Sequence, residues 1–373
     1  MIELSAYVAT PLCGLTLSQL GADVVRVEPL GGAPDRTRWP LSDSGTSLYW
    51  SGLNKGKRAV EVDLESEEDR RRVADLIVDG GPCAVVTNTD RHADLGYEAL
   101  SARRPDLIHV QLTGRADGGA AVDYTVQAGT GFPLLTGTGS APVNHVLPAW
   151  DVCAGLYLAV GLLAAERHRR ETGRGRSIRV ALEDVALATA GNLGYLAEAQ
   201  LTGHERCKSG NDIYGTYGHD FETADGERVM IVVLTTRHWE KLLAATGLTG
   251  AFSGMSEALG IDFSTESARY QHRDLITPLV ARWFRHTTFA EVSRILGQHR
   301  ILWERYRSFA ELGADGGAAL RSLDLFDEVD QPGAGRHWAP KSPIQVDGAR
   351  LPVRPAPETG QHNDEVLAPS ADR

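Results

Sequence analysis

Short apolar runs alternate with helical segments over the first two hundred residues. The runs are rich in β-branched residues, as buried strands are, and the segments between them carry apolar residues three and four positions apart, as helices do. This pattern predicts strands at residues 2–8, 23–29, 58–64, 83–88 and 106–114, helices at 12–22, 65–80, 97–104 and 152–165, and a strand followed by one long helix within 176–201. Such alternation indicates the α/β class with a parallel sheet.

The pattern changes near residue 214. A hairpin with a turn at Asp225-Gly226 comes first, helical stretches follow to about residue 312, and the end of the chain is strand- and loop-like. These features indicate a separate small α/β lobe, in keeping with a chain of 373 residues, which is too long for one ordinary core.

The segment 28–57 is rich in Gly, Pro, Asp and Ser, and it is long for a loop inside a compact domain. It is either a basic, aromatic loop that binds substrate or cofactor, or a surface excursion packed by its own aromatic rings. Composition favours neither. The basic and aromatic residues in and next to it are Arg36, Arg38, Trp39, Tyr49, Trp50, Lys55, Lys57 and Arg58.

Composition narrows the class of protein. With 42% hydrophobic and 23% charged residues, the chain is typical of soluble globular proteins. A net charge of −11 argues against a nucleic-acid partner, although a local basic cluster could still hold an anionic cofactor. The four cysteines lack metal-type spacing, no signal peptide is apparent, and the apolar stretch 152–165 is too short to span a bilayer. We therefore expect a cytoplasmic protein without a membrane partner.

Common catalytic and cofactor motifs are missing from the sequence. There is no GxGxxG after a strand, no GxxxxGK[ST], no GxSxG, no HExxH and no Cys-His pairing at useful spacing. We accordingly expect no metal site. The first predicted strand is also short at its N-terminal end.

Asp151 stands out in the stretch LPAWDVCAGL (147–156), directly before a long apolar run. From its position alone, an aspartate here is most often a helix N-cap. Its apolar neighbours Trp150 and Val152 leave a second reading open, because a poorly hydrated carboxylate held ionised by nearby helix N–H groups can attack an activated acyl group.

Several long segments, in order, resemble the family III CoA-transferases (the CaiB/BaiF group). They are ATPLCGLTLSQLGADVVRVEP (9–29), LYWSGLNKGKRAVEVDL (48–64), WDVCAGLYLAVGLLAAERHRRETGRGRSIRVALEDV (150–185), PGAGRHWAPKSPIQVDG (332–348) and PETGQHNDEVL (357–367). The resemblance implies a Rossmann-like large domain with a parallel sheet built from both chain ends (1–200 and 310–373), a small α/β domain (210–309) and an interlocked, ring-like homodimer.

The resemblance also implies a mechanism. Asp151 matches the aspartate with which the family's transferases attack a CoA thioester, giving an aspartyl anhydride and then an aspartyl-CoA thioester. Coenzyme A would enter as part of the substrate, and no tightly bound cofactor is expected. Racemases of the family use a histidine in a GHDxNY-like motif as a second base, and Val122 stands there in this chain. Racemisation is therefore not expected.

Within the family, VDYTVQAGTGFPLLTG (122–137) and PVNHVLPAWD (142–151) look most like the members that move CoA between the two carboxyl groups of one short dicarboxylate. Gln127 departs from this pattern, in which an asparagine is expected. The alternatives are transfer from an acyl-CoA to a separate acid, and a CoA-thioester binding protein without catalysis. The expected substrate contacts are Arg38, Tyr124, Asn144, His145 and Trp150, the last as a wall of the acyl pocket.

The family pattern places CoA contacts in four short segments. Two cationic contacts of other members are missing, since Pro29 and Ala120 stand in their places. Arg38, Lys57 and Arg58 are therefore candidates for the CoA phosphates together with Arg91, and each could equally be a solvated surface charge. The expected CoA contacts are Val8, Ala9, Val62, Asp63, Leu64, Asn88, Thr89, Asp90, Arg91, Val122 and Asp123.

Overall fold

The computed structural model describes residues 1–80 and 83–367, which form two compact units. The sheet unit comprises Met1–Phe132, Asn144–His204 and the chain from Leu312 onward. The small unit comprises Pro133–Val143 and Glu205–Glu311.

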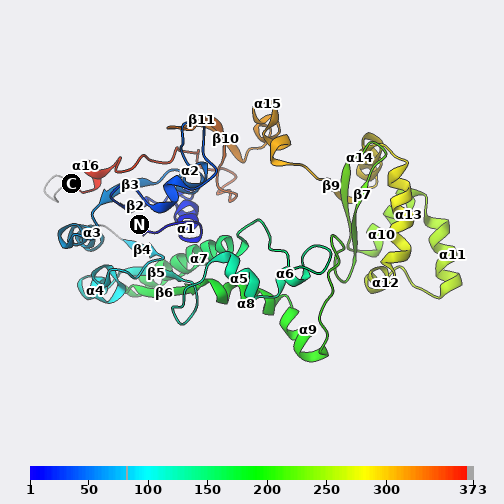
Figure 1. Cartoon of the computed structure of the whole chain (residues 1–373), viewed down its shortest axis with the longest axis horizontal. Coiled ribbons are helices and arrows are strands. Elements are labelled where there is room, and N and C mark those ends of the chain that lie inside the picture. Colours follow the sequence, from blue (N-terminus) through cyan, green and yellow to red (C-terminus); the bar gives the residue numbers. More distant parts are fainter. Residues whose placement is uncertain (81–82, 368–373) are drawn as a thin grey trace. The chain divides into compact units, whose positions relative to one another are not determined.

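A six-stranded parallel sheet organises the sheet unit, with strand order β3-β2-β1-β4-β5-β6 (Figure 1). The expected α/β class with a parallel sheet is thus confirmed. The order reverses between β1 and β4, and ligands of such sheets bind in the crevice outside the carboxyl ends of the strands at this switch point. The strands are β1 (Ile2–Leu4), β2 (Val25–Pro29), β3 (Arg58–Val62), β4 (Ala84–Thr87), β5 (Ile108–Thr113) and β6 (Arg176–Ala181).

Helices cover both faces of the sheet, because alternate residues along each strand point to opposite sides. On one face, α3 (Glu67–Asp79), α4 (Tyr97–Arg103) and α16 (Asn363–Val366) pack on apolar residues of β1 to β4. On the other, α1 (Ala9–Ser18) and α7 (Ala149–Thr172) pack on β4 and β5. The remaining helical segments of the sheet unit are η1 (Pro34–Thr37), α2 (Leu48–Asn54), η2 (Ala93–Leu95), α5 (Asp123–Gly129), α8 (Leu182–Asn192), α9 (Tyr195–Thr202) and α15 (Phe309–Arg321), the last beginning in the small unit, and α6 (Phe132–Leu135) joins the two units.

Helix α7 is longer than the sequence pattern predicts, 24 residues where 152–165 was expected. By length and composition, it is the one helix in the described part of the chain that could cross a membrane. Its Ala154, Leu158 and Ala165 are nevertheless buried, and the helix packs against α1, β5 and β6.

The C-terminal part joins the sheet unit without adding a strand to the sheet. All six parallel strands lie between Ile2 and Ala181, so the expectation of a sheet built from both chain ends is wrong in that detail. The C-terminal part instead contributes the antiparallel hairpin β10 (Phe326–Gln331) and β11 (Gly335–Pro340), and α16 beside β3.

The small unit contains the predicted hairpin, β7 (Tyr217–Glu222) with β8 (Arg228–Val233), and β9 (Leu302–Arg305) extends it to three antiparallel strands. An aromatic core of Phe221, Trp239, Phe252 and Phe284 lies between this sheet and the helices. These helices are α10 (Thr236–Thr246), α11 (Thr249–Leu259), α12 (Glu266–Gln271), α13 (Arg273–Arg285) and α14 (Phe289–Gln298).

Candidate active site

The four segments expected to contact CoA all follow strands at the carboxyl edge of the sheet. Val8 and Ala9 follow β1, residues 62–64 end β3, residues 88–91 follow β4, and Val122 and Asp123 open α5 after β5. The Asn88 side chain joins the first and third of these, since it donates to the Ala6 carbonyl at 2.9 Å and accepts from the Ala6 N–H at 3.3 Å. The turns after β1 and β4 therefore flank the switch point.

Asp151 lies in the first turn of α7, four residues before Gly155 and hence on the same helix face. A Cβ atom at position 155 would lie 2.6 Å from the Ala9 carbonyl oxygen, so glycine allows α7 to approach the start of α1. This close approach places the Asp151 face of α7 against the turn after β1.

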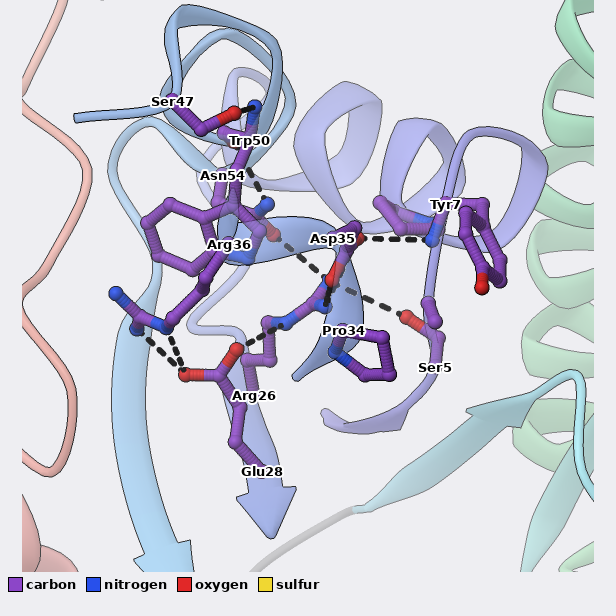
Figure 2. A network of polar contacts seen from close by, with 12 residues as sticks. Ser5, Tyr7, Arg26, Glu28, Pro34, Asp35, Arg36, Ser47, Trp50 and Asn54 are labelled. Carbon is purple, nitrogen blue, oxygen red and sulfur yellow. Dashed lines mark hydrogen bonds and ion pairs between the residues drawn. The ribbon is translucent and has the colours of Figure 1, made fainter. Parts of the chain in front are cut away.

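A fully buried network of charges lies behind that turn (Figure 2). Arg26 contacts Glu3, Glu28 and Asp35, each at 3.1 Å, and all four side chains are inaccessible to solvent. Lys57 also binds Glu3, at 2.9 Å. Burial lowers the pKa of Lys57 to about 8, opposed by the Glu3 charge.

The network holds two pieces of chain beside the carboxyl edge (Figure 2). Asp35 accepts a hydrogen bond from the N–H of Tyr7 at 2.8 Å, which supports the left-handed backbone of that residue at φ 73°. Arg36 pairs with Glu28 and lies over the Trp50 ring, 3.6 Å from its centroid. These contacts anchor segment 28–57 to the sheet unit, and they do not decide between a binding loop and a surface excursion packed by its aromatic rings.

The side chain of Arg38, which belongs to this anchored segment, lies close to two aromatic rings. Its guanidinium lies 4.9 Å from the ring centroid of Tyr49 and 5.6 Å from that of Tyr7. The Arg38 carbonyl accepts from the hydroxyl of Ser47, the N-cap of α2. Arg38 is exposed, and its positive charge acts on the Asp151 carboxylate.

Asp151 is not the N-cap of α7, so the reading from position alone is wrong. Pro148 is the N-cap, and it has no side-chain acceptor. The N–H groups of Trp150 and Asp151 donate to the Asp123 carboxylate at 2.7 and 3.1 Å, and that of Val152 donates to the Pro148 carbonyl. These N–H groups of the first turn of α7 therefore donate to Asp123 and Pro148, and not to the Asp151 carboxylate.

The electrostatic state of Asp151 also differs from expectation. Burial, and then the negative charge of Asp123, raise its pKa from 3.8 to about 7, and Arg38 opposes the shift. We expected helix N–H groups to hold the carboxylate ionised, but those groups already bind Asp123. Near neutral pH, Asp151 is divided between its protonated and ionised forms.

The expected substrate contacts Tyr124, Asn144, His145 and Trp150 have different environments. Tyr124 is partly exposed and donates to the Val146 carbonyl at 3.3 Å, and Asn144 is exposed. The ring of His145 lies 6.3 Å from that of Trp150. Trp150 itself is buried among Ala9, Val126, Ala154, Leu182, Val185 and Ala186, so it packs in the core beneath the site.

The four candidate phosphate contacts divide into two pairs. Lys57 is buried in the ion network, and Arg58 begins β3 at the amino edge of the sheet, where it pairs with Asp23 and Glu365. Neither lies at the carboxyl edge. Arg38 and Arg91 are exposed there, Arg91 at 2.9 Å from Glu65.

Two further residues of the candidate site, Tyr49 and Gln127, are not among the site residues that the sequence predicts. The Tyr49 hydroxyl is buried without a hydrogen-bond partner among the described residues, and burial raises its pKa to about 12, so it is a donor at neutral pH. Gln127 is fully buried and joins Asp123 to His145. The aromatic content of segment 28–57 pointed toward Tyr49, whereas Gln127 appeared only as a departure from a pattern.

The sheet unit is thus a doubly wound α/β domain with a partly buried carboxylate, Asp151, and an exposed arginine, Arg38, at the carboxyl edge of its sheet. Residues 1–363 match CoA-transferase family III, and the chain belongs to this family. It is a CoA-transferase of family III, as the sequence resemblance predicted.

Two relatives are similar over nearly the whole chain. The 2-methylfumaryl-CoA isomerase of Chloroflexus aurantiacus is 46% identical, with 98% of this chain and 91% of that protein aligned. The succinyl-CoA:mesaconate CoA-transferase of Haloarcula hispanica is 29% identical, with 98% and 94% aligned.

Solved structures show the same fold. A CaiB/BaiF family protein from Brucella suis superposes with a TM-score of 0.76 at 25% identity, covering 98% of this chain and 97% of that one. The orthorhombic form of Rv3272 from Mycobacterium tuberculosis superposes with a TM-score of 0.77 at 24% identity, covering 98% of each chain.

Proposed function

We propose that this CoA-transferase moves CoA between the two carboxyl groups of one short dicarboxylate, the mesaconyl-CoA C1 to C4 reaction, with Asp151 as nucleophile. The observation that carries the proposal is the placement of Asp151: a half-buried carboxylate with a pKa of about 7, facing Arg38 and the turn after β1. The name of the 46% identical relative supports this reaction, because mesaconate is 2-methylfumarate.

The proposed reaction proceeds in four balanced steps. The Asp151 carboxylate attacks the thioester carbon, a C–O bond forms, the C–S bond breaks, and CoA leaves as thiolate. The thiolate attacks the aspartyl carbon of the anhydride, giving an aspartyl-CoA thioester and a free dicarboxylate. The other carboxylate of the same dicarboxylate then attacks the aspartyl carbon of this thioester, forming a C–O bond and expelling CoA as thiolate, so that a second anhydride forms. The thiolate finally attacks the substrate carbon of that anhydride, forms the new substrate thioester, and releases the Asp151 carboxylate.

Arg38 and Tyr49 fit the requirements of this substrate. The carboxyl group of the bound thioester that does not carry CoA is an anion, and Arg38 is an exposed cation on the Asp151 side of the anchored loop. Tyr49 offers a buried hydroxyl donor with no partner among the described residues. We assign Tyr124, Asn144 and His145 to the same acyl end of the site.

The CoA moiety is proposed to lie along the carboxyl edge of the sheet. The turn after β1 and the end of β3 would contact it, as would residues 88–91 and Val122, with Arg38 and Arg91 available for its phosphates. The Asp123 carboxylate has a different use, since both of its oxygens accept hydrogen bonds within the chain. CoA is here a part of the substrate and not a resident cofactor.

We also propose a cytoplasmic homodimer. The outward face of α7 carries Leu156, Tyr157, Val160 and Leu163, each about half exposed or more, and α8 and α9 add Leu187, Leu193, Leu196 and Leu201. Exposed apolar patches of this kind mark interaction surfaces. A second copy of the chain covering α7 fits this surface.

The test is regioisomer conversion by the purified protein. Incubation with mesaconyl-C1-CoA alone should give the C4 thioester, separated by chromatography, with no added acid required. Asp151→Asn should lose activity by at least about 10³-fold, because the covalent route is closed. Hydroxylamine should trap a modified Asp151 in the wild-type protein, detected by peptide mass spectrometry.

Three outcomes would overturn this proposal. Turnover that depends on an added carboxylic acid would indicate intermolecular transfer. Binding of CoA without exchange in a panel of acyl-CoA esters would indicate a binding protein. Full activity of Asp151→Asn would remove the nucleophile.

A further inference from the structure

Helix α5 presents two buried polar side chains toward the start of α7. Asp123 and Gln127 are four residues apart and therefore share one face of the helix. Asp123 is 2% exposed and Gln127 is fully buried. A buried carboxylate is costly unless its oxygens accept hydrogen bonds, so its partners indicate its role.

All the partners of this pair tie α5 to the approach and first turn of α7. One Asp123 oxygen accepts from the N–H groups of Trp150 and Asp151, and the other accepts from the Gln127 amide at 2.5 Å. The Gln127 oxygen accepts from the N–H of His145 at 3.0 Å. Asp123 thus does for α7 what an N-cap side chain does, from a different helix, because Pro148 at the N-cap position has no acceptor.

We propose that Asp123 is a positioning residue for the reacting carboxylate: it fixes the first turn of α7, and with it Asp151, and its negative charge acts directly on Asp151. This inference rests on the proposed role of Asp151. It differs from a purely structural cap, which would hold the helix without influencing the ionisation of Asp151.

The charged and titratable groups around Asp151 make this difference measurable. Burial is the largest cause of the raised pKa of Asp151, and the negative charge of Asp123 is the second. The positive charge of Arg38 lowers this pKa. Other titratable groups on this side include Tyr49 on α2, Tyr124 on α5, His145 before α7 and Cys153 on α7, and the Asp35 charge acts on Tyr49. A more basic carboxylate is a stronger nucleophile, but less of it is ionised in acid, so Asp123 sets the pH below which activity falls.

The first variant is Asp123→Asn, which keeps an oxygen for the two α7 N–H groups and removes the charge. The acid limb of kcat/KM should move about one unit to lower pH. Asp123→Asn combined with Gln127→Glu keeps an acceptor for the His145 N–H and moves the charge one helical turn along α5. Its acid limb should lie between those of Asp123→Asn and the wild type, with kcat restored relative to Asp123→Asn.

Asp225→Asn is the matched control. Asp225 accepts from the N–H of Phe289, the first residue of α14, at 2.9 Å, so it also binds a helix start from another element, but within the small unit. This variant should keep the wild-type pH profile.

Two results separate failure of this inference from failure of the proposed function. If Asp123→Asn folds, as shown by circular dichroism, and keeps the wild-type acid limb, Asp123 is a structural cap and the inference is wrong, even when hydroxylamine still traps Asp151. If Asp151 is never trapped in the wild-type protein and Asp151→Asn stays active, the proposed function fails first, and the inference fails with it.

Discussion

At the residue scale, the environment of Asp151 is a balance between opposing effects. Burial and Asp123 favour its protonated form, and Arg38 favours the ionised form that can attack a thioester. The net result is a pKa of about 7, where the basicity of the carboxylate and its ionised fraction are both substantial. A carboxylate of ordinary pKa would be ionised more fully but would be a weaker nucleophile.

Replacing Arg38 by Gln should therefore shift activity in the direction opposite to Asp123→Asn. Without the positive charge, the pKa of Asp151 rises further, and the acid limb of kcat/KM should move to higher pH. KM should also rise, by about tenfold, because the free carboxylate of the substrate loses a cationic partner. Steady-state kinetics between pH 5 and 9 measure both effects, and an acid limb that stays in place would contradict the assigned contact.

Asp151→Asn should stabilise the folded protein at alkaline pH. Because the folded-state pKa is raised to about 7 from 3.8, the native state binds this proton more tightly than the unfolded chain does. The group therefore makes stability fall as pH rises from about 4 to 7, and the whole penalty is present above pH 7. Urea unfolding should show Asn more stable by about 1–3 kcal/mol at pH 8 and by much less at pH 4, after allowance for partial exposure. Equal differences at the two pH values would contradict the raised pKa.

At the element scale, β1 and β2 carry both the apolar core and the buried ion network. Ile2, Leu4, Val25 and Val27 face α3 and α4, while the alternate residues, among them Arg26, face the α1 side. Such alternation in sequence is typical of a strand with one solvated face. Here the polar face is buried as well, and charge pairing makes that possible.

Breaking this network should cost far more than breaking a surface ion pair. Asp35→Ala removes an acceptor from Arg26 and from the N–H of Tyr7, leaving a buried charge under-compensated, and should lower the free energy of unfolding by about 3–5 kcal/mol. The matched control is Asp75→Ala, which breaks a 2.7 Å pair with Arg103 between exposed side chains and should cost at most about 1 kcal/mol. Urea titration compares the two, and similar costs would contradict the structural role of the network.

The sequence predicts a helix, strand or hairpin correctly where a local pattern of residues is enough to determine it. The β3 strand, helix α3 and the Asp225-Gly226 hairpin follow from periodicity, an acidic helix start and turn chemistry. Helices α8 and α9 were expected as one, but Gly194 breaks them with φ 84°. The cap of α7 could not be predicted, because its acceptor, Asp123, lies 28 residues before Asp151 and meets it only through the fold.

At the scale of the whole molecule, the site is assembled from distant parts of the chain. Arg38, Asp123 and Asp151 come from three segments that the sheet order brings to one edge. The position of Asp151 was identified from collinear family resemblance, whereas its protonation and its contacts depend on residues far away in sequence. The sequence therefore predicts the candidate nucleophile better than it predicts how that residue is tuned.

The outward face of α7 provides the test of assembly. Val160 is 62% exposed on the same face as Leu156 and Leu163, so a charge there is compatible with the fold of one chain but not with an apolar interface. In sedimentation, the wild-type protein should have twice the mass of its 40.3 kDa chain, and Val160→Glu should dissociate or fail to assemble. Leu259→Glu, at a residue 55% exposed at the end of α11 in the small unit, is the control and should remain dimeric. A Val160→Glu protein that keeps the wild-type mass would show that α7 does not form the interface, and a monomeric wild-type protein would exclude the homodimer itself.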